Sequence, residues 1–192
     1  MWLLVPLGNP GPDYTATRHN LGRLMLQRWM QDHGPGPRVA RRLGSGTLYQ
    51  FKAPFQALVP ATYMNLSGQA CAEAVAAGCD PGRMILLNDD KDLPLGQGRF
   101  RLAGGDGGHN GLKSVFAELQ TQDLARLRLG IGPFQRPLVD FVLGQWTDPE
   151  WERIDAMDAP FARFMDLLAG TEDLDALAGT VNPASFWLPP LP

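Results

Sequence analysis

The sequence predicts an α/β protein, a three-layer sandwich in which helices cover both faces of one mixed, mostly parallel and twisted β-sheet. Short apolar runs alternate with stretches in which apolar residues recur at helical spacing, which is typical of this class. The chain of 192 residues has the length of one domain, and its 44% of apolar and 19% of charged residues are ordinary for a globular protein. We therefore expect residues 1–192 to form a single domain.

The N-terminal part is predicted to begin with a buried strand and a helix. Residues 2–7 form a continuous apolar run, and Leu21, Met25 and Trp29 then lie on one face of a helix over 21–30. The sequence GPGP, a strong turn signal at 34–37, follows that helix.

Further strands are indicated by short β-branched and apolar runs between turn residues. They are predicted at 39–43, 46–52, 56–59, 83–88, 97–102 and 126–131. Two more helices are predicted, one over 69–77, capped by Asn65 or Ser67, and one over 108–119 after a glycine-rich entry.

The C-terminal segment, 148–192, is predicted to be helical with an irregular, proline-rich tail from 182 onward. Asp148 is a favourable N-cap, and Pro149 suits the first helical position. Pro160 is expected to kink or split the helix. Its apolar stripe and acidic opposite face fit two interpretations, a mobile lid over the functional site or a plainly packed helix.

The net charge of −3 is unevenly distributed along the chain. Residues 1–136 carry 15 Lys and Arg against 10 Asp and Glu, whereas residues 137–192 carry 2 against 10. The basic part is compatible with an anionic partner, while the overall charge by itself fits an ordinary acidic cytoplasmic protein. No apolar run approaches the roughly 18–20 residues of a membrane helix, so we expect no membrane association and a cytoplasmic location.

Four polar clusters follow predicted strands or precede predicted helices, at residues 9–20, 60–68, 88–92 and 104–111. Five of the six asparagines lie in them. Because the carboxyl ends of parallel strands meet at one crevice, we expect side chains from all four clusters to lie together. The principal ones are His19, Asn65, Asp89 and Asn110.

These residue types suit the hydrolysis of an ester or amide by water. His19 can take a proton from water near neutral pH, and a carboxylate such as Asp89 can bind its other ring nitrogen and fix the tautomer. Asparagine amides can donate to an oxyanion. No G-x-S-x-G pattern is present, so direct attack by water is the simpler scheme.

Each feature also has a structural interpretation. His19 alone fits a histidine at a helix start, and Tyr63 and Met64 fit core residues. The glycine-rich run at 104–111 fits a flexible turn or an anion-binding nest. The joint occurrence of four clusters favours the functional interpretation.

In order and spacing, these motifs resemble bacterial-type peptidyl-tRNA hydrolases over residues 3 to about 146. The motifs are GNPG at 8–11, RHNLG at 18–22, MNLSG at 64–68, DLP at 92–94, GGHNGLK at 107–113, RLRLGIG at 126–132 and DFVLG at 140–144. The resemblance implies hydrolysis of the ester that joins a peptide to the 3′ end of tRNA. It also implies a monomer that needs no cofactor and no metal ion.

The resemblance implies a role for each matching residue. His19 corresponds to the base that activates water, and Asp89 corresponds to the residue that orients and polarises it. Three asparagines correspond to residues that hold the peptide, the scissile region and the water, and two further side chains line the site. These five residues are Asn9, Asn65, Asn110, Tyr14 and Met64.

Arg101 and Arg128 match the family positions that clamp a tRNA phosphate, where a Lys and an Arg are usual. Guanidinium groups bind phosphate in a bidentate manner that ammonium cannot. Three residues depart from the family pattern without removing a catalytic position: Asn88 where His is frequent, Lys91 where an apolar residue is usual, and Asp106 among the glycines.

Two other functions stay open at this point. A non-catalytic RNA-binding relative on the same fold would bind tRNA without turnover. A metal-dependent hydrolase would use residues such as His109 and Asp92 together with His19 and Asp89, although no H-E-x-x-H ligand pair occurs. The motifs do not tell whether His109 acts in the reaction or only packs.

Overall fold

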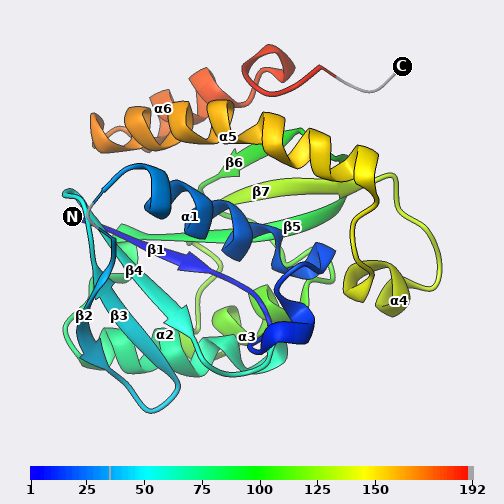
Figure 1. Cartoon of the computed structure of the whole chain (residues 1–192). Helices are drawn as coiled ribbons and strands as arrows, with labels where there is room; N and C mark the ends of the chain where they lie inside the picture. Colours follow the sequence, from blue (N-terminus) through cyan, green and yellow to red (C-terminus); the bar gives the residue numbers. More distant parts are fainter. Residues whose placement is uncertain (35, 190–192) are drawn as a thin grey trace.

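One seven-stranded sheet separates two layers of helices in the computed structural model (Figure 1). The strand order is β2-β3-β4-β1-β5-β7-β6. The strands are β1 (Trp2–Pro6), β2 (Arg38–Arg42), β3 (Gly46–Gln50), β4 (Phe55–Pro60), β5 (Met84–Pro94), β6 (Gly98–Arg101) and β7 (Ala125–Gly132). The structure describes residues 1–34 and 36–189, so Pro35 of the predicted turn and the last three residues of the predicted tail lie outside the described residues.

The four central strands are mutually parallel. β1 pairs in parallel with β4 and β5, and β5 pairs in parallel with β7. The pairs β2–β3, β3–β4 and β6–β7 are antiparallel. The predicted mixed, mostly parallel sheet is thereby confirmed, and the carboxyl ends of β4, β1, β5 and β7 lie at one edge of it.

The two helical layers follow from the alternation of side chains along the buried central strands. Leu4 of β1 belongs to the core under α1, α5 and α6, whereas Leu3 and Val5 belong to the core under α2 and α3. The helices are α1 (Leu21–Asp32), α2 (Ser67–Ala76), α3 (Asn110–Leu119), α4 (Leu138–Leu143), α5 (Asp148–Ala169) and α6 (Leu174–Val181). None of those described is long and apolar enough to cross a membrane.

The structure corrects several predicted element ends. Thr147, rather than Asp148, is the N-cap of α5, because Thr147 and Glu150 form a capping box. α5 continues without a break through the buried Pro160. Ser67 is the first residue of α2 and Leu66 is its N-cap, so neither predicted cap fills that position. Helix α4 was not predicted.

α5 is a layer of the core. Its buried side chains are Ile154, Met157, Pro160, Phe161, Phe164, Met165 and Leu168. No described residue of 148–189 lines the cavity at the site, whose helical lining comes instead from α4 and the start of α3. The lid interpretation of this segment therefore gains no support from the contacts, and the packed-helix interpretation describes them.

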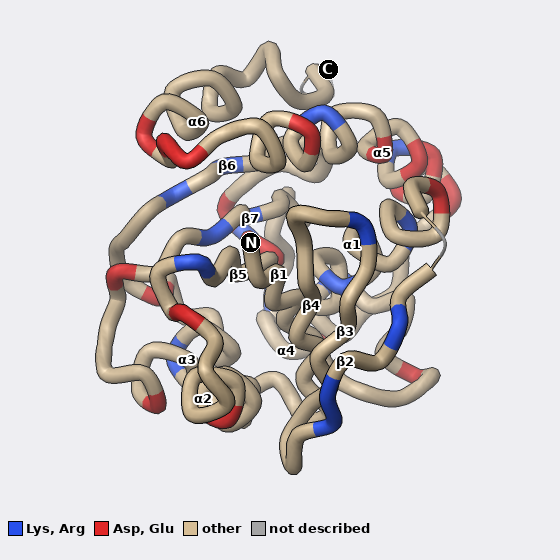
Figure 2. Tube along the Cα trace, turned by 90° about the vertical axis from the view of Figure 1, so that its left-hand side faces the viewer, with Lys and Arg blue, Asp and Glu red and all other residues tan. Residues whose placement is uncertain are grey.

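Basic and acidic side chains, which are unevenly distributed along the sequence, also lie on different parts of the fold. Figure 2 shows Lys and Arg along β2 and β6, the two edge strands, and Asp and Glu gathered along α5. The basic part of the chain thus flanks the carboxyl edge of the sheet on both sides. The carboxylates of α5 would repel an anionic ligand only on the face of the molecule that α5 covers.

Gly68 provides a test of the packing between α2 and α3. A Cβ atom there would lie 2.2 Å from the backbone oxygen of Ser114, and the Gly68 N–H already donates to Ser114 Oγ at 2.9 Å. Gly68→Ala is expected to lower the free energy of unfolding by about 1–3 kcal/mol, measured by urea denaturation. The control is Gly179→Ala in α6, where no atom lies within 4 Å and a gain of up to about 1 kcal/mol is expected. Equal losses in both variants would contradict this account.

Candidate active site

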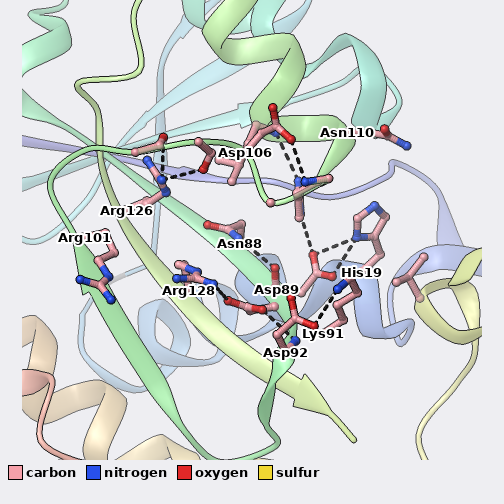
Figure 3. Close-up of a pocket in the computed structure, with 18 of the residues that line it drawn as sticks. His19, Asn88, Asp89, Lys91, Asp92, Arg101, Asp106, Asn110, Arg126 and Arg128 are labelled. Atoms are coloured by element: carbon pink, nitrogen blue, oxygen red, sulfur yellow. Dashed lines mark hydrogen bonds and ion pairs between the residues drawn. The ribbon is translucent and has the colours of Figure 1, made fainter. Parts of the chain in front are cut away.

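Side chains of three of the four polar clusters line a cavity of about 350 Å³ at the carboxyl edge of the sheet (Figure 3), and the fourth cluster, residues 60–68, adjoins the first through the hydrogen bond from the Met64 N–H to Asn9. His19 and Asp89 lie on one side of this cavity, and the arginines of β6 and β7 lie on the other. The loop 103–108 and α4 complete the wall. Asp89 lies within β5 itself, because the strand continues through the polar run to Pro94 instead of ending at residue 88.

His19 and Asp89 form a buried hydrogen-bonded pair. His19 belongs to the 3₁₀ turn Arg18–Asn20, which leads directly into α1. Its Nδ1 lies 2.9 Å and 3.0 Å from the two carboxylate oxygens of Asp89, and the two residues are 9% and 4% exposed. Because an ionised carboxylate only accepts, Nδ1 carries the proton, and Nε2 is left with a free lone pair.

His109 is a second donor to the same carboxylate. It is the N-cap of α3, where its Nδ1 accepts from the backbone N–H groups of Gly111 and Leu112 at 3.1 Å and 3.2 Å. Its proton is therefore on Nε2, which donates to Asp89 Oδ1 at 2.9 Å.

Asp89 is the charged centre of this group. Burial by itself raises the pKa of the Asp89 carboxyl, but the two neighbouring imidazoles outweigh burial and hold the pKa well below its usual range. Asp89 is therefore ionised at neutral pH. It can stabilise an imidazolium at His19 when that ring takes up a proton.

The three residues also form the one group of His, Cys, Asp and Glu, among the residues the structure describes, whose ligand atoms converge as for a metal ion. Those atoms lie within 4.8 Å of one another. However, the imidazole nitrogens that face Asp89 already donate to it, and Nδ1 of His109 accepts from the backbone. A metal ion would have to break these bonds, so the arrangement fits hydrogen bonding better than metal ligation.

Asn9 connects the first cluster to the second. Its Oδ1 accepts from the Met64 N–H at 2.8 Å, which leaves the Nδ2 group to donate to a substrate. The side chain of Asn20 binds both the N–H and the carbonyl of Asn9 at 2.9 Å. Asn20 was expected in the first polar cluster, directly after His19, but no role was predicted for it.

Arg23 holds the same loop from behind. Its guanidinium donates to the carbonyls of Gly8, Asn9 and Pro60, which join the loop after β1 to the end of β4. Burial lowers the pKa of Arg23 to about 10. Arg23 was not predicted as a site residue, because no local sequence pattern distinguishes a helix arginine that donates to carbonyls distant in sequence.

Met64 lies against His109 and α3. A Cβ at Gly111 would lie 2.5 Å from Met64 Sδ and 3.0 Å from the His109 ring, so a glycine is needed there for this contact. Asn65 and Asn110 are exposed, the latter at the cavity wall. Tyr14 packs edge to face with Tyr63 at 6.1 Å between ring centroids.

Four arginines share one face of the β6–β7 pair. Arg99 pairs with Arg128 and Arg101 with Arg126 in antiparallel register, and directly opposed residues point to the same side of a sheet. Phe100, between them, points into the core on the other side. Only Arg101 and Arg128 were predicted as phosphate ligands, although the R-x-R spacing in both strands indicates all four arginines.

The arginines differ in how they are held. Arg126 is buried and donates to the carbonyls of Gly104 and Gly105 at 2.8 Å and 2.9 Å, while Arg128 pairs with Asp90 and Arg101 is exposed. Burial, with the charges of Arg128 and Arg101, lowers the pKa of Arg126. Arg126 thus supports the loop, and Arg101 is the most accessible cation.

The three departures from the family pattern take structural positions. The Asn88 side chain donates to the Asp89 carbonyl at 2.8 Å. Lys91 pairs with Asp92 at 2.6 Å and lies over the ring of Phe134. Asp106 accepts from the Gly108 N–H at 2.7 Å and so closes the glycine-rich turn.

Comparisons with known proteins agree with this geometry. The family model described as peptidyl-tRNA hydrolase matches residues 3–186. A peptidyl-tRNA hydrolase of Methylacidiphilum infernorum is 37% identical over 169 residues, which cover 86% of this chain and 90% of the relative. That of Symbiobacterium thermophilum is 40% identical over 185 residues, with 93% and 86% covered.

The fold agrees over nearly the whole length as well. The crystal structure of peptidyl-tRNA hydrolase from Acinetobacter baumannii superposes with a TM-score of 0.83 at 28% identity, covering 96% of this chain and 95% of that one. Sequence motifs, fold and family model therefore point to the same group of enzymes. This chain belongs to the peptidyl-tRNA hydrolase family.

Proposed function

We propose that this chain hydrolyses the ester between a peptide and the 3′ end of tRNA with a water molecule that His19 activates, without a metal ion. The observation that carries the proposal is the pair of imidazole N–H groups directed at Asp89. Because His19 donates through Nδ1, its Nε2 is an unprotonated base at the cavity wall.

In the proposed reaction, His19 Nε2 accepts a proton from water as the water oxygen attacks the ester carbonyl. Asp89 stabilises the resulting imidazolium. The amide groups of Asn9, Asn65 and Asn110 supply donors for the tetrahedral oxyanion and acceptors for the peptide N–H. The bond to the ribose 3′ oxygen then breaks as His19 returns the proton to that oxygen, which leaves a free tRNA 3′ hydroxyl and a peptide carboxylic acid that loses its own proton to solvent.

The cavity wall opposite the arginines is suited to a peptide. Leu138, Val139 and Val142 of α4 line it, and the first two are among the exposed large apolar side chains of the described residues. An apolar wall without fixed polar partners accepts side chains of varied sequence. We therefore place the peptide along α4 and the RNA along the β6–β7 arginines, with Tyr14 and Met64 lining the site.

Arg101 and Arg128 are proposed to bind a tRNA phosphate. Arg101→Ala and Arg128→Ala are each expected to weaken tRNA binding and to reduce the slope of log Kd against log salt concentration by about one, because each lost phosphate contact releases fewer counterions. Equilibrium binding at several salt concentrations measures this. Arg41→Ala on β2, at the opposite edge of the sheet, is the matched control. A slope that stays the same in both clamp variants would contradict the clamp.

The site and the fold support two further expectations. All residues of the proposed machinery come from one chain, which supports a single domain acting as a monomer. A tRNA ester is a substrate of the cytoplasm, where translation takes place, which supports a cytoplasmic location.

The proposed activity is tested by release of an N-acetylated amino acid from tRNA by the purified protein, with and without a chelator. Turnover that is indifferent to the chelator is the expected result. Binding of tRNA without turnover would favour the non-catalytic RNA-binding relative. Activity lost with chelator and restored by a divalent ion would favour the metal-dependent hydrolase.

A further inference from the structure

Arg18 lies directly before His19 in the 3₁₀ turn and has no part in the proposed reaction. It does not line the cavity, and its side chain is only 12% exposed. Its guanidinium carbon lies over two aromatic rings, 5.0 Å from the ring centroid of Phe141 in α4 and 5.0 Å from that of Trp146. A guanidinium over aromatic faces is held by cation–π attraction. The side chain of Arg18 is therefore packed as well as charged.

The hydrogen bonds of Arg18 join its turn to the chain that leaves α4. Nη1 donates to the carbonyl of Gln145 at 2.9 Å, and Nη2 donates to both carboxylate oxygens of Glu150 in α5 at 2.9 Å. The backbone N–H of Arg18 donates to the carbonyl of Gly144 at 3.1 Å. A Cβ at Gly144 would lie 2.7 Å from Nη1, so this close approach needs a glycine. The turn is thus fixed to the end of α4 by side chain and backbone together.

Helix α4 depends on contacts of this kind for its position. It has six residues and none of its side chains is fully buried, and a helix so short is not stable by itself. It packs against the 3₁₀ turn of residues 18–20. On its other side, Leu138, Val139 and Val142 line the cavity as the wall proposed for the peptide. The peptide wall and the proposed base therefore share one anchor.

We propose that Arg18 is a positioning residue for the hydrolysis, which holds α4 on the turn that carries His19 so that peptide and base meet at the ester in one geometry. This inference rests on the proposed function. Reacting groups must lie about 3–3.5 Å apart in the right orientation, and a displacement of about 1 Å costs on the order of 10²-fold in rate. Arg18 contacts no reacting atom and acts only through the turn and α4.

Loss of the Arg18 side chain is expected to affect the chemical step more than substrate binding. Arg18→Ala should lower kcat for N-acetylaminoacyl-tRNA about 10- to 100-fold, because the base and the peptide wall are no longer held together. KM should change little, since the arginines that face the RNA lie across the cavity. Arg18→Lys keeps the charge but neither the planar stacking nor the fork of donors, so it should recover only a small part of kcat.

Arg28→Ala is the matched control for stability. Arg28 of α1 forms ion pairs with Asp155 and Asp158 of α5, and these ion pairs, unlike those of Arg18, involve neither α4 nor the turn of His19. The variant should lower the melting temperature and keep the wild-type kcat. If Arg28→Ala lowers kcat as much as Arg18→Ala does at an equal loss of melting temperature, activity follows stability and the proposal is overturned.

Hydrogen exchange of the backbone amides over residues 138–145 tests the anchor without an activity measurement. These amides should exchange about tenfold faster or more in Arg18→Ala than in wild type, because local opening of α4 no longer breaks the contacts of Arg18. They should exchange at the wild-type rate in Arg28→Ala. Exchange that is unchanged in Arg18→Ala would overturn the proposal. If wild type has no esterase activity, the proposed function fails, and the exchange rates still decide whether Arg18 holds α4.

Discussion

Replacing His19 with alanine is expected to lower kcat for ester hydrolysis by about 10²- to 10⁴-fold, the usual contribution of a general base. The affinity for tRNA should change little, because the arginines that face the RNA lie across the cavity from His19. Single-turnover hydrolysis of N-acetylaminoacyl-tRNA gives the rate, and equilibrium binding gives the affinity.

The control for this variant is His33→Ala. His33 stacks on Trp29 at the end of α1 and has no part in the site. It should keep wild-type activity, which separates a loss of the base from a general loss of histidine packing. Full activity in His19→Ala would mean that another group activates the water.

The alternation of elements could be predicted from the sequence because the central strands are buried on both faces and appear as uninterrupted apolar runs. β1 and the start of β5 are of this kind. The meeting of His19 and Asp89 could be anticipated for a related reason, since parallel strands bring their carboxyl ends to one edge.

The end of β5 could not be predicted, because it depends on a distant partner. Residues 88–92 are polar and appear as a loop, yet Asn88 pairs with Arg128 and Pro94 pairs with Gly132 of β7. That pairing keeps the chain extended and fixes Asp89 in a rigid strand. A local pattern contains no information on a neighbour that follows more than thirty residues later.

The start of α5 was difficult to predict for a different reason. Thr147 and Asp148 are both good N-cap residues, and the choice depends on the acidic side chain three residues later. Glu150 is in register with Thr147, and it also receives both Nη2 hydrogen bonds of Arg18, at 2.9 Å each. A tertiary contact with the turn that carries His19 therefore supports the observed helix start.

Asp89→Asn tests the hydrogen-bond argument most directly. His109 donates through Nε2, because its Nδ1 is held by two backbone N–H groups, so an asparagine would keep its single side-chain oxygen at the Oδ1 position and place its NH₂ where Oδ2 now lies, 3.0 Å from His19 Nδ1. The amide NH₂ would then face His19 Nδ1 as a donor. His19 would have to accept there and carry its proton on Nε2, which removes the lone pair that attacks water.

We therefore expect Asp89→Asn to lower kcat by about 10³- to 10⁴-fold with the fold intact, as the wrong imidazole tautomer does in related catalytic groups. Nitrogen-15 NMR of the histidine rings should show the proton of His19 moving from Nδ1 to Nε2. Asp123→Asn, at an exposed position, is the control. Activity within tenfold of wild type would show that Asp89 does not set the tautomer.

The stability of Asp89→Asn should also depend on pH, with a sign fixed by the lowered pKa of Asp89. A carboxyl whose folded pKa lies below the ordinary value of about 3.9 stabilises the fold fully above that value, and the stabilisation is lost as the pH falls through the folded pKa. The difference in unfolding free energy between wild type and Asp89→Asn should therefore be largest near neutral pH and shrink below about pH 4. A difference that grows on acidification would mean that the two imidazoles do not outweigh the burial of Asp89.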